Sequence, residues 1–278
     1  MVVLSAYAAP FGMKRIFITG ASSGIGLAIA KLLVAQGHEV WGTSRNLERI
    51  PQIPRLHPVR LDLSDRHSIG EAFNAALSEA GHFDVVINNA GAGHFDPAEL
   101  LPMETIASQF QILVFGQIQL MQLALRYMQD RGEGLIINVT SLASRFPVPF
   151  MAAYNSAKAA LAAFTMSIQL ELGNSRVHIV DLQPADISTE FNQSVIKTAK
   201  TDRYDTKIAK TWETADRNMK KAPGPDLVAQ HVLKLINTMR PPPRITVGDV
   251  FQSKIGPLIF RFLPQRVRIW GLKRYYGI

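Results

Sequence analysis

Short apolar runs alternate with amphipathic stretches along most of this chain. The short runs, at 14–19, 38–44, 56–62, 83–91, 134–141, 176–184 and 244–248, predict β-strands. Apolar residues at helical spacing predict helices at 24–37, 64–81, 102–128, around Tyr154 and at 226–237. Strands separated by helices of this length favour a parallel sheet covered on both faces. We therefore predict a single α/β domain with a doubly wound sheet of about seven strands.

Both ends of the chain depart from this alternation. Residues 1–12 lack the basic segment of a secretory signal, and the first strand begins just after Met13. We therefore expect a disordered extension at 1–12, with Met13 as a candidate start, and a main domain at 13–250. Residues 251–278 form a tail in which arginine, lysine and aromatic residues are interleaved, and Pro257 and Pro264 each predict the start of a short helix.

Composition narrows the classes of function only slightly. The chain has no cysteine, which excludes disulfides and thiolate metal sites, and we expect no metal centre. No apolar run is long enough to predict a membrane-spanning helix. The formal charge of +8 suits a phosphorylated ligand or an anionic surface. The basic residues are dispersed and no recognition module is present, so we do not expect nucleic-acid binding.

A glycine-rich turn, "TGASSGIG" at 19–26, lies between the first predicted strand and the first predicted helix. Gly20 permits a tight turn, Gly24 allows the backbone to approach a pyrophosphate, and Gly26 lets the helix pack on the sheet. The helix N-terminus offers free N–H groups to phosphate. The position of this turn predicts a Rossmann-type dinucleotide site. Its expected contacts are Gly20, Ser22, Ser23, Gly24, Ile25 and Gly26.

The end of the second predicted strand bears on the choice of dinucleotide. An acidic residue there would bind the ribose 2′-hydroxyl of NAD, whereas this chain has Arg45. A charge-assisted hydrogen bond contributes about 1.5–3 kcal/mol, which would favour NADP by roughly tenfold to a hundredfold. We therefore expect NADP(H), although Arg45 also fits a solvated loop position.

Four motifs in order, "TGASSGIG", "NNAG" (88–91), "NVTS" (138–141) and "YNSAK" (154–158), resemble the short-chain dehydrogenase/reductase family. The resemblance covers the chain to about residue 190. It implies that Asp62 meets the adenine ring and that Asn89, Ala90 and Gly91 brace the sheet beside the cofactor. It also implies catalytic roles for Ser141, Tyr154 and Lys158. The family's Pro-Gly-x-Val-x-Thr segment corresponds to "PADIST", which places Pro184, Ile187 and Thr189 near the nicotinamide, with Ala185 in the place of glycine.

Tyr154 and Lys158 lie one helical turn apart and therefore share a helix face. The resemblance implies that Tyr154 is the acid in carbonyl reduction, or the base in the reverse direction. Lowering a phenol pKa by about three units requires roughly 4 kcal/mol. An ammonium about 4 Å away supplies that amount at an effective dielectric of about 20. We therefore expect Lys158 to lower the pKa of Tyr154 and Ser141 to polarise the substrate oxygen.

One position departs from the family pattern. The family has a fourth catalytic residue, an asparagine that holds a proton-relay water, and Leu113 occupies its place here. Leucine neither donates nor accepts a hydrogen bond. Two hypotheses remain: an active reductase with another water path, or a weakly active NADP(H)-binding regulatory protein.

The expected substrate cleft is apolar. Phe146, Val148, Phe150 and Met151 lie between Ser141 and Tyr154, and His94 is expected at its rim. We expect a hydrophobic secondary alcohol, ketone or aldehyde of steroid, retinoid or lipid type; a 3-oxoacyl thioester is the alternative. In the family, a substrate-covering segment corresponds to 190–225. The tail is expected either to pack over the cleft or a second subunit, or to touch an anionic membrane. We expect a cytoplasmic homodimer or homotetramer, with membrane contact as the open alternative.

Overall fold

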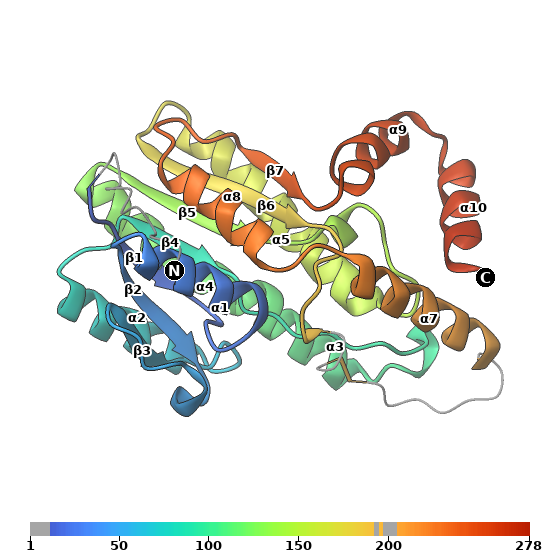
Figure 1. Cartoon of the computed structure of the whole chain (residues 1–278), viewed down its shortest axis with the longest axis horizontal. Coiled ribbons are helices and arrows are strands. Elements are labelled where there is room, and N and C mark those ends of the chain that lie inside the picture. The colour runs from blue at the N-terminus through green and yellow to red at the C-terminus, as the bar shows by residue number, and fades with distance from the viewer. Residues whose placement is uncertain (1–11, 192–194, 197–204) are drawn as a thin grey trace, which may run out of the picture.

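The computed structural model describes residues 12–191, 195–196 and 205–278, and its centre is a parallel sheet (Figure 1). The sheet has seven strands in the order β3-β2-β1-β4-β5-β6-β7, and every neighbouring pair is parallel. The order reverses between β1 and β4, which is the point where doubly wound sheets bind ligands. The strands are β1 (Arg15–Ile18), β2 (Glu39–Ser44), β3 (Leu56–Arg60), β4 (Val85–Asn88), β5 (Gly134–Val139), β6 (Val177–Pro184) and β7 (Arg244–Val247). The predicted α/β doubly wound fold is confirmed.

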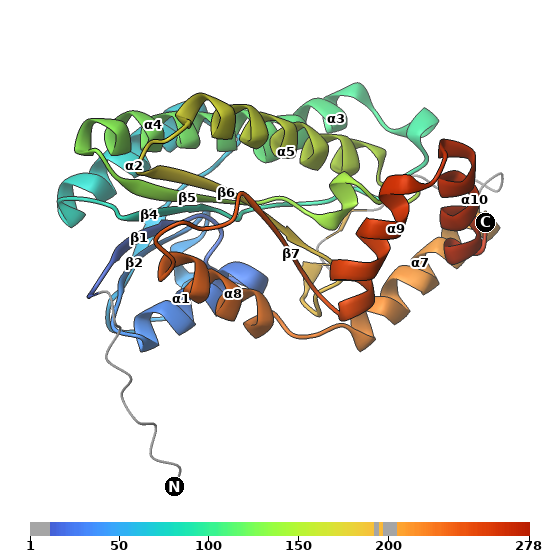
Figure 2. The same ribbon diagram turned by 90° about the horizontal axis from the view of Figure 1, so that it is seen from above.

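Helices cover both faces of the sheet (Figure 2). One face carries α1 (Gly24–Ala35) and α8 (Asp226–Ile236), which pack on each other. The other face carries α2 (Arg66–Ala80), α4 (Gly116–Arg131) and α5 (Ala152–Leu172). Successive strand residues point to opposite faces, so neighbours on one strand enter different cores. In β1, Ile16 and Ile18 join the first core and Phe17 joins the second.

A buried polar network connects the middle of the sheet to α5. The Asn88 side-chain amide donates to Asn138 Oδ1 at 2.8 Å, and the Asn138 amide donates to Thr165 Oγ1 at 2.8 Å. All three residues are buried, so each hydrogen bond replaces one that water would otherwise make. The network holds the carboxyl ends of β4 and β5 against α5, the helix that carries Tyr154 and Lys158.

The long helix predicted at 102–128 is a composite. It consists of α3 (Met103–Phe110), a π-helical turn η3 (Gln111–Phe115) and α4. The N–H of Gly116 donates to the carbonyl of Gln111, five residues earlier, which marks the wider turn. Such turns are rare and shift the face that later residues present. Periodicity alone did not predict this interruption.

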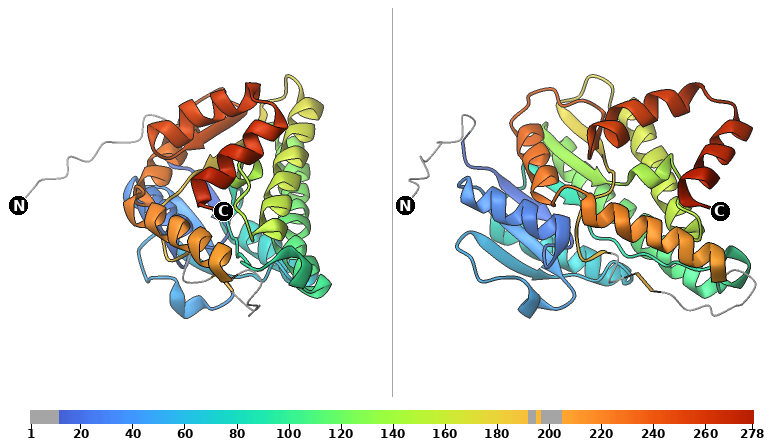
Figure 3. Two further views of the ribbon diagram at one scale, coloured as in Figure 1. Left: turned by 90° about the vertical axis from the view of Figure 1, so that its right-hand side faces the viewer. Right: turned by 45° about the vertical axis from the view of Figure 1, so that its right-hand side comes forward.

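The chain after β6 covers the carboxyl edge of the sheet (Figure 3). A polar helix that the sequence did not predict, α7 (Asp205–Lys221), falls inside the segment expected to cover the substrate. After β7 come a π-helical turn η5 (Phe251–Ile255), α9 (Gly256–Phe262) and α10 (Gln265–Tyr276). Pro257 lies in the first turn of α9 and Pro264 is the N-cap of α10, as expected. The expectation for residues 1–11 lies outside the described residues.

Short 3₁₀ segments connect several of these elements. They are η1 (Leu47–Arg49), η2 (Ala98–Leu100) and η4 (Leu142–Ser144). The last one lies just after β5 and has Ser141 as its N-cap; the Ser141 hydroxyl accepts a hydrogen bond from the Ala143 N–H at 3.0 Å. This cap holds Ser141 at the carboxyl end of β5, where ligands bind in such sheets.

Candidate active site

A cavity of about 1330 Å³ opens at the carboxyl edge of the sheet. Every residue that the sequence assigned to catalysis or to the cofactor lines it, although these residues come from seven separate segments of the chain. They are Gly20, Ser22, Ser23, Gly24, Ile25, Gly26, Arg45, Asp62, Asn89, Ala90, Gly91, Ser141, Tyr154, Lys158, Pro184, Ile187 and Thr189. The fold therefore brings the predicted residues together in one place.

The glycine turn has the shape that a pyrophosphate needs. Gly20 and Gly24 have φ angles of 74° and 52°, in the region that favours glycine. A Cβ on Gly26 would lie 2.1 Å from the carbonyl oxygen of Gly20, so only glycine fits where α1 begins. The side chain of Ser23, the N-cap of α1, makes no capping hydrogen bond. The helix N-terminus at the cavity thus keeps N–H groups for an anion, and these residues fit the phosphates of a dinucleotide.

Asn89 ties the turn after β4 to the glycine turn. Its side-chain amide donates to the carbonyl of Thr19 at 2.9 Å. The N–H groups of Asn89 and Ala90 both donate to Thr19 Oγ1, at 2.9 Å and 3.0 Å. The floor of the cavity is therefore held by side chains as well as by the sheet.

The far end of the cavity carries positive charge. Arg45, Asn46 and Arg49 line it after β2, and the hydrogen-bond acceptor Asp62 follows β3. Burial raises the pKa of Asp62, but hydrogen bonds from Ser64 and the charges of Arg45 and Arg60 outweigh this and lower it. Asp62 therefore stays anionic near neutral pH. Arg45 and Arg49, which line the cavity, could bind an additional phosphate. This set of residues fits the adenosine end of a dinucleotide.

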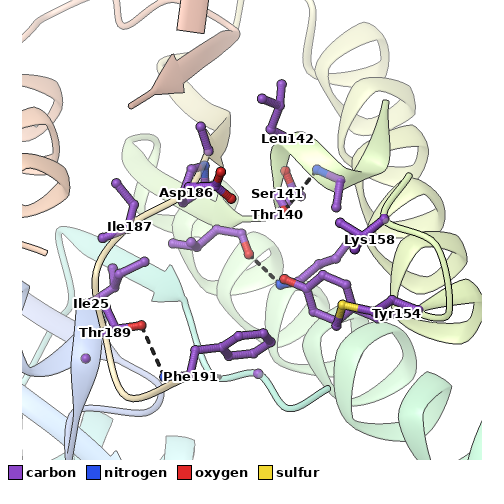
Figure 4. A pocket seen from close by; sticks show the side chains of 18 of the residues that line it. Ile25, Thr140, Ser141, Leu142, Tyr154, Lys158, Asp186, Ile187, Thr189 and Phe191 are labelled. Carbon is purple, nitrogen blue, oxygen red and sulfur yellow. Dashed lines mark hydrogen bonds between the residues drawn. The ribbon is translucent and has the colours of Figure 1, made fainter. Parts of the chain in front are cut away.

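Ser141, Tyr154 and Lys158 meet at the other end of the cavity (Figure 4). Tyr154 and Lys158 come from α5 and Ser141 follows β5. Lys158 donates from Nζ to the carbonyl of Val139 at 2.8 Å, and its Nζ lies 5.9 Å from the centre of the Tyr154 ring. The helix therefore places the phenol and the amine on one face, as the spacing predicts.

The electrostatics of this pair differ from the expectation. Burial raises the pKa of Tyr154 to about 12, and the hydrogen bond with Ser141 only partly offsets this. Burial also lowers the pKa of Lys158 to about 8, opposed by the charge of Asp181. The prediction that Lys158 brings the phenol pKa down was wrong for this structure: burial determines the direction of the shift, and the group that opposes it is Ser141. The phenol is consequently protonated at neutral pH.

Leu113 lies within the π-helical turn and is fully buried against Val114 and Ala157. It lines the cavity but brings no polar atom to it. One helical turn earlier, Gln109 also lines the cavity; its amide donates to the carbonyl of Ala92 at 3.1 Å, while its buried Oε1 has no partner among the described residues. Among the cavity-lining residues of this helix, Gln109 is therefore the polar residue closest in sequence to Leu113.

The remaining walls are mostly apolar. Phe146, Val148 and Met151 line the cavity as expected, and His94 lies at its wall. Phe150 does not line it and instead packs on Phe95, with ring centres 5.7 Å apart. Phe150 belongs to an apolar cluster with Phe95, Met151 and Tyr154. The Tyr154 ring therefore packs against apolar side chains of this cluster.

Sequence reasoning missed residues that arrive from distant parts of the chain. Asp186 lies in the segment after β6, and Met219 belongs to α7. Gln252, Tyr275 and Tyr276 come from the C-terminal segment. Phe260 of α9 packs on Phe146 with ring centres 4.3 Å apart, which holds the tail against the cavity wall. The aromatic residues of the tail indicated that it packs on something, but the spacing of residues did not identify Phe146 as the contact.

The chain is similar in sequence to short-chain dehydrogenases and reductases. Residues 14–200 match the family profile described as short chain dehydrogenase. A 3-ketodihydrosphingosine reductase of Bacteroides thetaiotaomicron is 28% identical over 273 residues, covering 95% of this chain and 98% of that protein. An NADPH-dependent 1-acyldihydroxyacetone phosphate reductase of Schizosaccharomyces pombe is 32% identical over 189 residues, covering 66% of this chain and 64% of that protein.

A solved structure supports the fold. A short-chain dehydrogenase from Streptomyces avermitilis superposes with a TM-score of 0.81 at 24% identity, covering 95% of this chain and 97% of that one. At this identity the match concerns the fold alone. The match extends over nearly all of both chains.

Proposed function

This chain belongs to the short chain dehydrogenase family, and on that premise we propose that it is an NADP(H)-dependent reductase of lipid-like ketones. That the protein is an oxidoreductase follows from the family; the cofactor, the direction and the substrate class are our proposal. The observation that carries it is the cavity. It joins an arginine-lined adenosine end to a Ser141–Tyr154–Lys158 end with apolar walls.

NADPH is the cofactor that the donor set favours. Arg45 and Arg49 line the cavity, and neither forms an ion pair with any residue that the structure describes. Two free guanidinium groups match the charge of a 2′-phosphate better than that of a neutral ribose. The relative from Schizosaccharomyces pombe, named as NADPH-dependent, supports the same choice.

The residues at the other end assign the proton chemistry. NADPH, when bound, supplies the hydride that reduces the carbonyl carbon. Tyr154 then donates its phenolic proton to the carbonyl oxygen, since its raised pKa keeps it protonated at neutral pH. The Ser141 hydroxyl donates a hydrogen bond to the same oxygen as charge develops there. Lys158 in its cationic form stabilises the phenolate that remains.

The apolar walls argue for a substrate with a long hydrocarbon portion. Phe146, Val148 and Met151 line the cavity, as do Ile259, Leu263 and Val267 of the tail. Side chains of this kind exclude water and select by buried area rather than by hydrogen bonds. The two lipid-related reductases among the relatives support this class. Steroid, retinoid and 3-oxoacyl thioester substrates remain the competing predictions.

A substrate panel tests this function. Long-chain ketones, a steroid ketone, retinal and a 3-oxoacyl thioester are each supplied with NADPH, and nicotinamide absorbance is followed. We expect turnover of a long-chain ketone and its loss in Tyr154→Phe. Tight NADPH binding with no turnover of any carbonyl would instead favour the regulatory hypothesis raised by Leu113.

We propose in addition that the tail contacts an anionic membrane. After Asp249 the chain has no acidic residue but has six basic ones: Lys254, Arg261, Arg266, Arg268, Lys273 and Arg274. Leu258, Phe262 and Trp270 are 62%, 77% and 67% exposed and do not line the cavity. Exposed apolar side chains between cations are typical of interfacial helices. Among the described residues, no helix is long and apolar enough to cross a bilayer.

Flotation with phosphatidylglycerol vesicles tests the membrane contact. The double variant Phe262→Ser with Trp270→Ser removes two exposed apolar groups, and Met239→Ser is the matched control because Met239 is 82% exposed outside the tail. We expect the double variant to lose flotation and the control to retain it. Equal flotation of all three proteins, or flotation equal on neutral vesicles, would contradict the proposal. We also expect the protein to self-associate, and sedimentation of the protein without vesicles measures this.

A further inference from the structure

A carboxylate of no assigned role points into the cavity from the segment after β6. Asp186 lies between Pro184 and Ile187, the two positions expected beside the nicotinamide, and it lines the cavity with Ser141 and Tyr154. In Figure 4, its carboxylate is directed to the side on which Ser141 lies. Asp186 therefore belongs to the substrate end of the cavity.

The charge of Asp186 has no countercharge within the described part of the chain. Gln252 donates from Nε2 to Asp186 Oδ2 at 2.6 Å, and its Oε1 accepts from the Asp186 N–H at 3.3 Å. No lysine, arginine or histidine of that part forms an ion pair with it. The charged group that acts on it is another carboxylate, Asp249.

This arrangement is unfavourable until something compensates the charge. Burial raises the pKa of Asp186, the hydrogen bond from Gln252 offsets part of the rise, and the charge of Asp249 adds to it. An isolated carboxylate out of water is costly, and a paired one much less so. The chain is strongly basic, with a formal charge of +8, yet among the described residues no cation is paired with Asp186. A cationic group on the substrate would supply the missing charge.

We propose that Asp186 binds an ammonium group carried by the substrate close to its reacting carbonyl, so that the preferred substrates are long-chain amino ketones. This inference rests on the proposed reductase function and extends it. A neutral hydroxyl would hydrogen-bond to the carboxylate but would leave its charge uncompensated. The apolar walls hold the hydrocarbon chain, while Asp186 and Ser141 fix the two polar groups of the head.

Asp186 also has a structural contact, and the variant must preserve it. In Asp186→Asn, the remaining carbonyl oxygen still accepts from Gln252 Nε2, so the contact between the β6 segment and the tail is kept. Asp249→Asn is the matched control, since it removes the same charge nearby. Asp249 Oδ1 accepts from the N–H groups of Phe251 and Gln252 at 2.8 Å and 3.0 Å, and an asparagine oxygen can do the same.

The experiment compares two ketones of equal chain length, one bearing an amine on the carbon beside the carbonyl and one bearing hydrogen there. The kcat/KM of NADPH oxidation is measured for both ketones with the wild type and both variants. Asp186→Asn is expected to lower kcat/KM for the amino ketone by about tenfold to a hundredfold, the range of a hydrogen bond to a charged group. It should change the plain ketone by less than about threefold, and Asp249→Asn should have a smaller effect on the amino ketone.

A binding measurement separates recognition from chemistry. Calorimetric titration with a long-chain alkylamine and with the alkanol of equal length needs no turnover. The wild type should bind the amine more tightly, and Asp186→Asn should lose that preference. Equal loss on both ketones, or an unchanged amine preference in the variant, would overturn the inference while leaving the reductase function intact. Failure of the wild type to reduce either ketone would overturn the proposed function and this inference with it.

Discussion

Reduction by this enzyme should slow as pH rises through the pKa of Lys158. Tyr154 must leave a phenolate behind when it donates its proton. With a phenol pKa of about 12, forming that phenolate at neutral pH costs about 7 kcal/mol, because each of about five pKa units is worth about 1.4 kcal/mol. A cationic Lys158 is the group placed to reduce this cost. Burial lowers its pKa to about 8.

The sign follows from which form of the lysine carries charge. Below its pKa Lys158 is the ammonium ion and stabilises the phenolate; above it the amine is neutral and does not. We therefore expect kcat/KM for ketone reduction to be level below about pH 8 and to fall by up to about tenfold per pH unit above it.

The assay follows NADPH oxidation with a long-chain ketone from about pH 6 to about pH 10, with circular dichroism confirming that the protein stays folded. Lys158→Met is the informative variant, since methionine fills a similar buried volume without charge. Its activity should be low and should lack the inflection near pH 8. A wild-type rate that rises between neutral and alkaline pH would refute the assignment of Tyr154 as donor and Lys158 as its cation.

Three further predictions concern the cofactor site and the fold. Arg45→Ala should weaken NADPH binding by about tenfold to a hundredfold in fluorescence titration, while NADH binding changes little. Gly26→Ala puts a methyl group 2.1 Å from the Gly20 carbonyl oxygen; it should lower both Tm and NADPH affinity, whereas Gly70→Ala, with open space around it, should not lower Tm. Thr165→Val should reduce the free energy of unfolding by about 1–3 kcal/mol in urea titration, and Thr165→Ser by less.

The fold was readable because its strands are short apolar runs separated by helices with regular apolar spacing. All seven predicted strands occur, and the glycine turn joins β1 to α1 as expected. The π-helical turn around Leu113 was not predicted, because one additional residue in a helix leaves the periodicity on each side intact. The helix α7 was not predicted because its apolar residues are few.

The sequence predicted those parts of the candidate site that depend only on residue type and local spacing. Tyr154 and Lys158 needed only one helical turn to be placed together. The direction of the phenol pKa was wrong because burial depends on the packing of distant elements around α5, which spacing does not contain. Asp186 and Gln252 were missed for the same reason: they are separated by 66 positions in the chain and meet only in the folded protein.

Proton donation by Tyr154 is the central claim, and one measurement tests it most directly. Enzyme loaded with NADPH is mixed with the long-chain ketone in a single turnover, and the loss of nicotinamide absorbance is compared between the wild type and Tyr154→Phe. We predict unchanged NADPH affinity and a rate about 10²–10⁴-fold lower in the variant, the usual contribution of a positioned acid. A variant that reduces the ketone as fast as the wild type would contradict the account.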